Sequence, residues 1–139
     1  MGIKNKVSVD WKGKMAFEAE VNGFKLLMDA ISDVGGEDKG PRPMPLILSA
    51  LGGCTGMDVI SILAKMKVFP DNFSVDVEAE ITEEYPKYYN KIKVLYLFKG
   101  NNLPKSKIEK AVALSKERYC GVNKLLSFGA EITHEIKII

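Results

Sequence analysis

The first third of the chain alternates apolar and polar residues in three short runs. Residues 6–12, 15–21 and 24–29 follow this alternation, which is typical of strands with one buried face. Asn22-Gly23 separates the last two runs, and this dipeptide favours a two-residue hairpin turn because both positions tolerate positive φ. The pattern therefore predicts a three-stranded antiparallel meander.

A long apolar segment follows a loop at residues 33–43. Pro43 and Pro45 suit the first turn of a helix, where a missing backbone N–H costs nothing. Apolar positions then recur at helical spacing as far as Met66, and they extend beyond one face of the helix. We therefore expect a long helix buried at the centre of the fold.

The rest of the pattern completes one α+β domain. It predicts two strands, a helix with a short helical turn after it, and a final strand, at residues 73–81, 91–98, 104 to about 119, 121–126 and 131–139. The order βββ-α-ββ-α-β favours mainly antiparallel pairing. With 139 residues, the chain is expected to form a single domain, residues 1–139.

Charge and composition exclude several classes of partner. Twenty Lys and Arg residues balance 18 Asp and Glu residues, and the net charge of +2 argues against a nucleic-acid partner. The pattern shows neither a signal peptide nor an apolar run of the roughly 20 residues that cross a membrane. We therefore expect a cytoplasmic protein without a membrane partner.

Two cysteines and one histidine are the candidate reactive side chains. In a reducing compartment, Cys54 and Cys120 are expected to serve catalysis, redox chemistry or packing rather than a structural disulfide. With His134 they supply too few ligands for a structural zinc site, so no metal is predicted. The sequence also lacks a phosphate-binding glycine loop and a dinucleotide fingerprint, so no cofactor is predicted.

Cys54 has the more unusual surroundings. It lies in Leu51-Gly52-Gly53-Cys54-Thr55-Gly56, and each glycine inside a helix costs roughly 1 kcal/mol relative to alanine. Two interpretations stand: small neighbours keep a reactive thiol reachable, or they let the helix pack closely around an inert one.

Cys120 is expected at a helix C-terminus, the wrong end of the dipole for a thiolate. This makes Cys54 the better nucleophile candidate and leaves Cys120 open to a packing role. Asp58 follows Cys54 by one helical turn, and a carboxylate near a thiol raises the thiol pKa. Asp58 is therefore expected to pair with a lysine such as Lys65 or to face away. His134 is expected on the polar face of its strand, solvated or hydrogen-bonded.

Two segments carry a family resemblance over essentially the whole chain. Residues 43–60, PMPLILSALGGCTGMDVI, resemble the central helix of the OsmC/Ohr family of organic hydroperoxide-detoxifying proteins. Residues 117–122, ERYCGV, resemble the second cysteine motif of that family, and residues 131–134 are similar to its YhfA-like branch.

The resemblance implies an OsmC-like fold, an intertwined homodimer with buried central helices, and a thiol peroxidase activity. Cys54 would attack an organic hydroperoxide and become a sulfenic acid, and Cys120 would condense with it to form a transient disulfide. A dithiol reductant, lipoyl-type or other, would then reset the pair.

The sequence departs from the peroxidase branches at their supporting residues. Met44 and Pro45 stand where those branches carry a glutamate, and no arginine precedes Arg42. Lys12, Lys14 and Arg42 are the candidate replacements, although lysine lacks the guanidinium fork.

The candidate substrate pocket is lined by Met44, Leu48 and Phe128, which favours hydrophobic or aromatic hydroperoxides. The departures leave two alternatives open: a non-catalytic small-ligand-binding module and a redox sensor. A metal site formed by Cys54, Cys120 and His134 ranks last.

Overall fold

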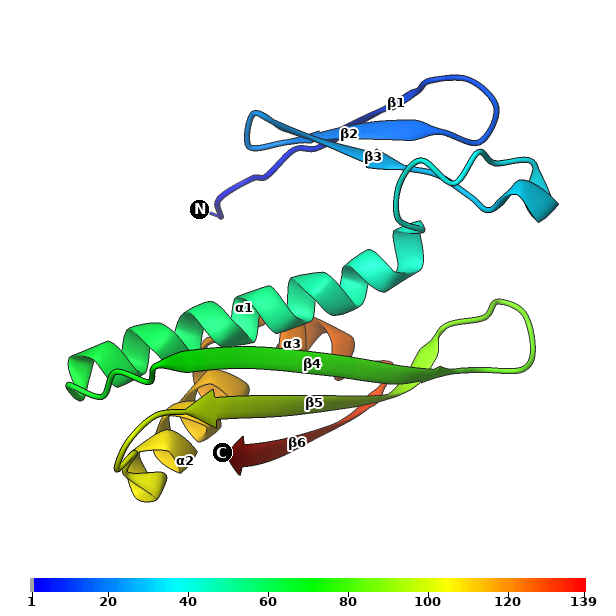
Figure 1. Ribbon diagram of the computed structural model, residues 1–139. Helices are drawn as coiled ribbons and strands as arrows, with labels where there is room; N and C mark the ends of the chain where they lie inside the picture. The colour runs from blue at the N-terminus through cyan, green and yellow to red at the C-terminus, as the bar shows by residue number, and fades with distance from the viewer. Residues whose placement is uncertain (1) are drawn as a thin grey trace. The chain divides into compact units, whose positions relative to one another are not determined.

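A computed structural model describes residues 2–139 of the chain. The chain forms two compact units, with the boundary between Ile47 and Leu48 (Figure 1). That the whole chain, residues 1–139, forms a single domain stays a prediction.

The first unit contains the expected three-stranded meander. Its strands are β1 (Ser8–Trp11), β2 (Phe17–Val21) and β3 (Phe24–Met28), paired antiparallel in the order β1-β2-β3. Asn22 and Gly23 have φ angles of 53° and 84°, so both positions of the predicted hairpin turn take up the left-handed region.

Asp29 organises the loop that follows β3. Its side chain accepts hydrogen bonds from the backbone N–H groups of Ala30 at 2.7 Å and of Glu37 and Lys39 at 3.3 Å. These backbone donors, Ala30 first, lower the pKa of the Asp29 carboxyl. The loop includes a 3-10 turn at Ser32–Val34 and is tied together by one buried carboxylate.

The second unit is a three-stranded sheet with helices packed on one face. Its strands are β4 (Asn72–Ile81), β5 (Tyr89–Lys99) and β6 (Glu131–Ile138), in the order β4-β5-β6. β4 pairs antiparallel with β5, whereas β6 pairs parallel with β5. The first of its helices, α1 (Pro43–Lys65), crosses the boundary and belongs to this unit from Leu48 onward. The other helical elements are α2 (Lys105–Leu114), a π-helical turn (Ser115–Tyr119) and α3 (Gly121–Leu126). The element order predicted from the sequence is confirmed.

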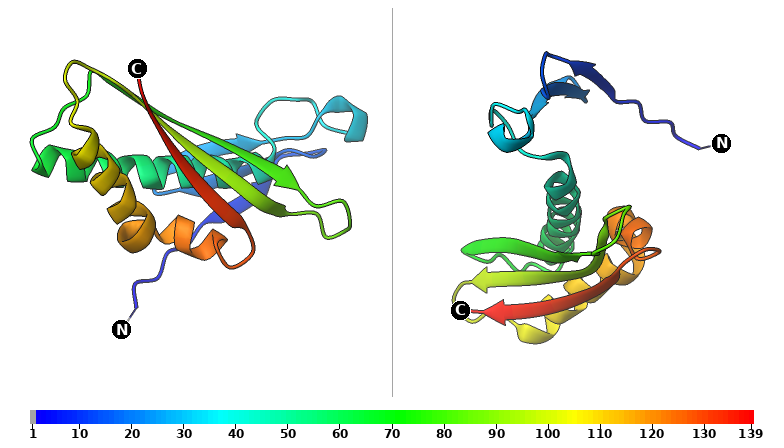
Figure 2. Two further views of the ribbon diagram at one scale, coloured as in Figure 1. Left: turned by 90° about the horizontal axis from the view of Figure 1, so that it is seen from below. Right: turned by 90° about the vertical axis from the view of Figure 1, so that its right-hand side faces the viewer.

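The core of this unit lies between α1, α2 and the inner face of the sheet (Figure 2). From Leu51 onward α1 contributes every fourth residue, and β5 contributes every second residue: Leu51, Thr55, Val59 and Leu63, and Ile92, Val94, Tyr96 and Phe98. These spacings of four and two are the periods of a helix and a strand that share one apolar layer.

The glycines around Cys54 have different roles. A Cβ at Gly52 would lie 3.3 Å from Val77 on β4, and a Cβ at Gly56 would lie 3.5 Å from Val75. These two glycines let α1 approach β4 closely, which supports the packing interpretation at both positions. Gly53 has open space around it within the unit, so the reachable-thiol interpretation applies to it alone.

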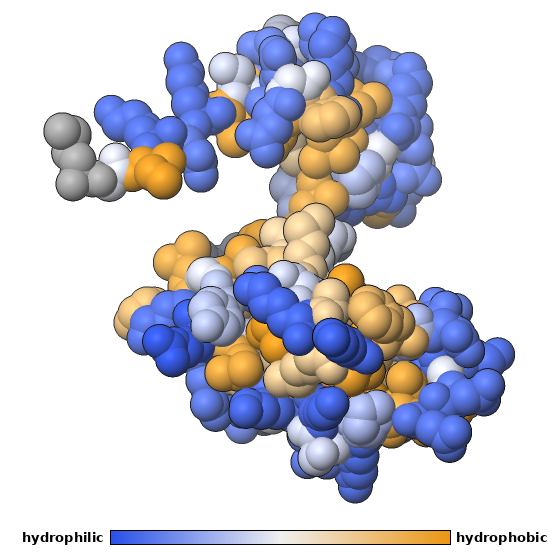
Figure 3. Space-filling model, turned by 90° about the vertical axis from the view of Figure 1, so that its left-hand side faces the viewer, coloured by the Kyte–Doolittle hydropathy of each residue, from blue (hydrophilic) through white to orange (hydrophobic). Residues whose placement is uncertain are grey.

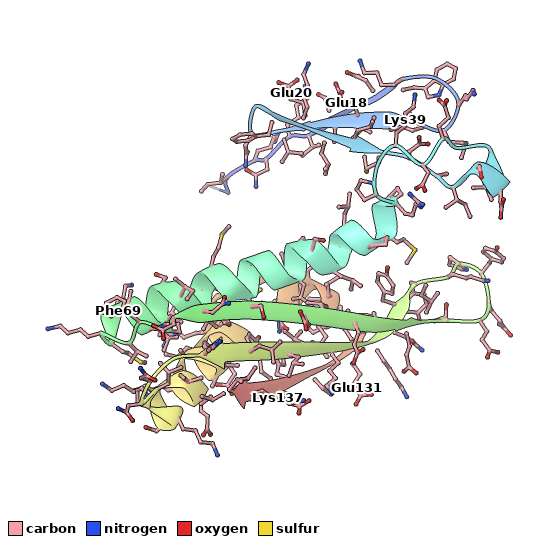
Figure 4. The ribbon with its side chains drawn as sticks, in the orientation of Figure 1. Glu18, Glu20, Lys39, Phe69, Glu131 and Lys137 are labelled. Carbon is pink, nitrogen blue, oxygen red and sulfur yellow. The ribbon has the colours of Figure 1, made fainter. Side chains whose placement is uncertain are left out.

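The outer face of the sheet is charged. Lys93 on β5 and Glu135 on β6 form an ion pair at 2.8 Å. Glu131 and Lys137 lie on this same side, away from the helices (Figure 4). The cysteines and His134 therefore belong to the opposite, helix-covered side of the sheet.

α1 corrects one expectation from the sequence. It has 23 residues and is long and apolar enough to cross a membrane by length and composition, contrary to the prediction that no such segment exists. Core helices of soluble proteins pass the same test, and α1 places Leu51, Val59 and Leu63 in the core. Its other side leaves Met57 and Ile60 exposed, and apolar surface appears among charged side chains in Figure 3.

Candidate functional site

The structure brings the two predicted cysteines together. Cys54 lies in the third turn of α1 and is half-buried, whereas Cys120 is buried between the π-helical turn and α3. Their Sγ atoms and a carboxylate oxygen of Asp58 all lie within 4.8 Å of one another. Two thiols 66 positions apart in the sequence therefore meet in one cluster, which we call the thiol cluster (Cys54, Asp58, Cys120).

Cys120 lies between two helices, ending one and beginning the next. The π-helical turn closes with a hydrogen bond from the Cys120 N–H to the Ser115 carbonyl oxygen at 2.9 Å. The chain then starts α3, where the Cys120 Sγ caps the N-terminus by accepting from the Asn123 N–H at 3.3 Å. The expectation that Cys120 lies at a helix C-terminus is confirmed, and the structure adds that the same residue caps the N-terminus of α3.

Burial dominates the acidity of Cys120. Desolvation raises the pKa of this thiol to about 11, although the Asn123 N–H acts in the opposite direction. Cys54 and the charge of Asp58 raise the pKa further. Cys120 is therefore a protonated thiol at neutral pH, as suits a resolving cysteine more than an attacking one.

Asp58 faces the thiols, which corrects a second expectation. The Ser115 hydroxyl donates to Asp58 Oδ2 at 3.1 Å, and Ser115 is fully buried. Among residues 2–139, no Lys or Arg forms an ion pair with Asp58, so the expected partner Lys65 does not play that role. The spacing of four residues after Cys54 was the signal in the sequence that placed both on one helix face.

His134 belongs to the inner side of the sheet, close to the core. It shares a strand face with Ile132 and Ile136, so its assignment to the polar face is wrong. The expectation that it is hydrogen-bonded is confirmed, because Tyr96 Oη lies 2.9 Å from its Nδ1. Its Nε2 is buried without a partner in the described part of the chain.

Burial shifts both members of this pair toward their neutral forms. Desolvation raises the pKa of Tyr96 to about 12, and the charges of Cys120 and Asp58 add to that effect. Desolvation and the positive charge of Lys116 lower the pKa of His134 to about 4. Tyr96 is thus electrostatically linked to the thiol cluster, and His134 holds its hydroxyl in place.

The three candidate supporting cations all lie in the first unit. Lys12 and Lys14 form ion pairs with Glu18 at 4.0 Å and Glu37 at 3.7 Å. Arg42 pairs with Asp38 and donates to the Gly40 carbonyl oxygen at 2.7 Å. Their role beside Cys54, which lies in the second unit, stays a prediction.

The candidate pocket residues have different environments. Met44 lies in the first turn of α1, and Leu48 packs against the core one turn later. Phe128 follows α3 and is 77% exposed, with the Lys124 ammonium 5.1 Å from its ring centroid. Their joint role in lining a pocket stays a prediction.

The thiol cluster supports two kinds of chemistry. The two sulfur atoms lie within 4.8 Å of each other and both belong to free thiols, which is the arrangement that thiol–disulfide chemistry requires of its two cysteines. The same two sulfurs and the Asp58 oxygen offer three ligand atoms for a soft metal ion such as Zn²⁺. His134 is not part of this group, in contrast to the metal site considered from the sequence.

Comparisons with known proteins agree with this architecture. A family model described as "OsmC-like protein" matches residues 36–135. The chain is 34% identical to "Protein YhfA" of Escherichia coli K12 over 132 residues, 94% of this chain and 96% of that protein. A hypothetical protein from Aquifex aeolicus VF5 has a similar structure, with a TM-score of 0.87, 25% identity, and 100% and 98% of the two chains covered.

A more distant structure has a more informative description. It is described as an organic hydroperoxide resistance protein OsmC from Legionella pneumophila and as a predicted redox protein. Its TM-score is 0.72, with 14% identity and 97% of each chain covered. At this identity the similarity shows the shared fold.

Proposed function

Because this chain belongs to the OsmC-like protein family, we propose that it is a thiol-dependent peroxidase that reduces organic hydroperoxides through Cys54 and Cys120. The family includes proteins described as organic hydroperoxide resistance proteins. The observation that carries the proposal is the meeting of two free thiols within 4.8 Å.

The two cysteines would divide the reaction. Cys54 is the more accessible thiol, so it attacks the distal oxygen of R–O–O–H, the O–O bond breaks, and the products are Cys54 sulfenic acid and the alcohol ROH. Cys120 then attacks the sulfenic sulfur, and a disulfide forms with the loss of water. Two thiols of a dithiol reductant reduce the disulfide and are themselves oxidised to a disulfide.

Buried thiols suit such a reaction with apolar substrates. Cys120 is 4% exposed, and the core around the cluster includes Leu51 and Tyr96. A hydrophobic hydroperoxide is therefore the proposed substrate class, a lipoyl-type or other dithiol is the proposed reductant, and the cytoplasm is the proposed compartment.

The proposed assembly is a homodimer. α1 leaves Met57 77% exposed and Ile60 43% exposed on the side away from the sheet. A second copy of the chain would cover this apolar side, as expected for obligate interfaces. Light scattering on the purified protein tests this, with a mass of two chains expected.

A thiol count tests the activity. The purified chain is mixed with one equivalent of cumene hydroperoxide, and its free thiols are counted before and after. We expect loss of two thiols per chain within seconds and a Cys54–Cys120 crosslink in the peptide map. Cys120→Ser is expected to trap a Cys54 sulfenic acid that reacts with dimedone, whereas Cys54→Ser is expected to be inert. Two thiols that persist for many minutes in the wild type would contradict the proposal.

A redox sensor is the second candidate, and the uncompensated charge of Asp58 beside the thiols favours it. A carboxylate in this position disfavours thiolate formation, which suits slow, stoichiometric oxidation. Repeated turnover with dihydrolipoamide separates the two: many cycles support the peroxidase, and a single oxidation without recycling supports the sensor.

A further inference from the structure

Asp58 is the one ionisable group in the thiol cluster besides the thiols themselves. One helical turn separates it from Cys54, so both side chains leave α1 on the same face. A carboxylate oxygen lies within 4.8 Å of each sulfur. The Ser115 hydroxyl donates to Asp58 Oδ2 at 3.1 Å, which holds the carboxylate in place.

The negative charge of Asp58 lies beside two thiols and has no cationic partner among the described residues. The charge of Asp58 raises the pKa of Cys120 and of Tyr96, so it disfavours the thiolate form of Cys120. No Lys or Arg of residues 2–139 neutralises it through an ion pair. A site built only to stabilise a thiolate would carry a cation at this position, as low-pKa cysteines do.

We propose that Asp58 is the proton carrier of both half-reactions. This inference rests on the proposed peroxidase function. In the first half-reaction, the Asp58 carboxylate takes the proton of the Cys54 thiol as the sulfur attacks the distal peroxide oxygen. The resulting Asp58 carboxylic acid gives that proton to the departing alkoxide, which leaves as ROH, and the carboxylate is restored.

The second half-reaction repeats the transfer with the other thiol. Asp58 takes the proton of Cys120 as its sulfur attacks the Cys54 sulfenic acid, and it returns the proton to the departing hydroxide. Water leaves, the disulfide forms, and Asp58 ends ionised as it began. One carboxylate can serve both steps because it lies between two thiols that react in sequence.

The chemistry fits the residue types. Attack by a protonated thiol with a positioned base avoids the need for a free thiolate, and general acid–base catalysis typically contributes about 10²- to 10⁴-fold. The alkoxide is a poor leaving group without a proton. A carboxylic acid that delivers this proton therefore accelerates cleavage of the O–O bond. The π-helical turn fixes both Ser115 and Cys120 around Asp58, and such turns are frequent at functional sites.

The rates at which Cys54 reacts with two different electrophiles distinguish proton delivery to the leaving group from loss of the thiol proton. Cumene hydroperoxide needs a proton for its leaving group, whereas iodoacetamide releases iodide and needs none. Both reactions are measured at Cys54 in a Cys120→Ser background, with Asp58 or with Asp58→Asn. The asparagine keeps the shape of the side chain and can still accept from Ser115.

The expected result is a split between the two rates. Asp58→Asn slows sulfenic acid formation tenfold or more and slows alkylation much less, because alkylation loses only the base, whereas peroxide reduction loses both the base and the proton for its leaving group. Asp58→Glu restores part of the peroxide rate. Asp76→Asn, which alters an exposed carboxylate on β4, changes neither rate. In the chain with both cysteines, Asp58→Asn prolongs the life of the Cys54 sulfenic acid trapped by dimedone.

Other outcomes overturn the inference. If Asp58→Asn accelerates both reactions, the carboxylate acts only through its charge. If it slows both equally, the carboxylate delivers no proton to the departing alkoxide. A wild-type chain that does not react with cumene hydroperoxide contradicts the proposed function itself, which keeps the two failures distinguishable.

Discussion

Tyr96 and His134 meet across two neighbouring strands, with Tyr96 Oη 2.9 Å from His134 Nδ1 and the ring centroids 5.8 Å apart. His134 is paired in register with Val94, so Tyr96 is its diagonal neighbour on the same face of the sheet. The contact ties the fully buried centre of β5 to β6 and leaves the second ring nitrogen of His134 buried without a partner among the described residues.

Protonation of His134 is expected to destabilise the fold. Because burial lowers its pKa from 6.5 to about 4, the unfolded chain takes up a proton first as the pH falls. Stability is therefore fully present above pH 6.5 and declines toward pH 4, by about 1–2 kcal/mol after allowance for solvent screening. Urea unfolding at pH 7 and pH 4.5 measures this difference.

The matched variant for this experiment is His134→Gln. It lacks the titrating group and is expected to lose less stability between the two pH values than the wild type does. An NMR titration gives the direct check, since the His134 ring signals should not shift until the pH approaches 4. A midpoint near 6.5 would contradict the buried, neutral imidazole.

Removal of the Tyr96 hydroxyl is expected to be costly. Tyr96→Phe leaves His134 Nδ1 buried without its partner, and an unsatisfied buried polar group costs about 1–3 kcal/mol. Tyr88→Phe is the control, since Tyr88 is 50% exposed and its change should stay within about 0.5 kcal/mol. Equal effects of the two substitutions would show that the hydrogen bond contributes nothing to stability.

The glycines beside Cys54 are expected to respond in opposite directions to the same substitution. Gly53→Ala adds a methyl group in open space within a helix, which should stabilise the protein by about 0.5–1 kcal/mol. Gly52→Ala places its methyl group 3.3 Å from Val77, so the helix–sheet contact must yield and the gain is cancelled or reversed. Thermal unfolding of the two variants compares them, and Gly52→Ala should melt at the lower temperature.

Cys120 is expected to lose its proton only at high pH. In a Cys54→Ser chain, the rate of its alkylation by iodoacetamide should rise with pH toward a midpoint well above the ordinary value, because burial raises the pKa of this thiol and the charge of Asp58 adds to that effect. The same chain in denaturant supplies the reference, with a midpoint near the ordinary value of about 8.5. Coincident midpoints would show that the folded chain does not bury this thiol.

Much of the fold could be predicted because its signals are local. Asn22-Gly23 marks its hairpin through two positive φ angles, and Pro43 begins α1 as its missing N–H allows. The alternation in β4 and β5 separates a charged face from an apolar one. Each of these depends on a few consecutive residues, so no tertiary information was needed.

The details of the site could not be predicted because they depend on packing between distant segments. The π-helical turn at Ser115–Tyr119 has no marker in its sequence, and neither does the Cys120 Sγ that caps the N-terminus of α3. Asp58 turns toward the thiols because Ser115, 57 residues later, donates to it. His134 has the polarity of an outward-facing residue, although it alternates in phase with Ile132 and Ile136. Its partner Tyr96 lies 38 residues earlier in the chain and could not be predicted.

The π-helical turn also makes the site sensitive to the length of the chain. Its closing bond joins Cys120 to the residue five positions earlier, so the turn holds one residue more than an α-helix would. Deleting one of the exposed residues in the turn, such as Glu117, would let the regular ladder resume and rotate every later residue by about 100°. The shortened chain would still contain Cys54, Asp58 and Cys120, but Cys120 would no longer lie beside the other two. A relative of this protein is therefore best judged by its spacing between Ser115 and Cys120, as well as by the presence of the two cysteines.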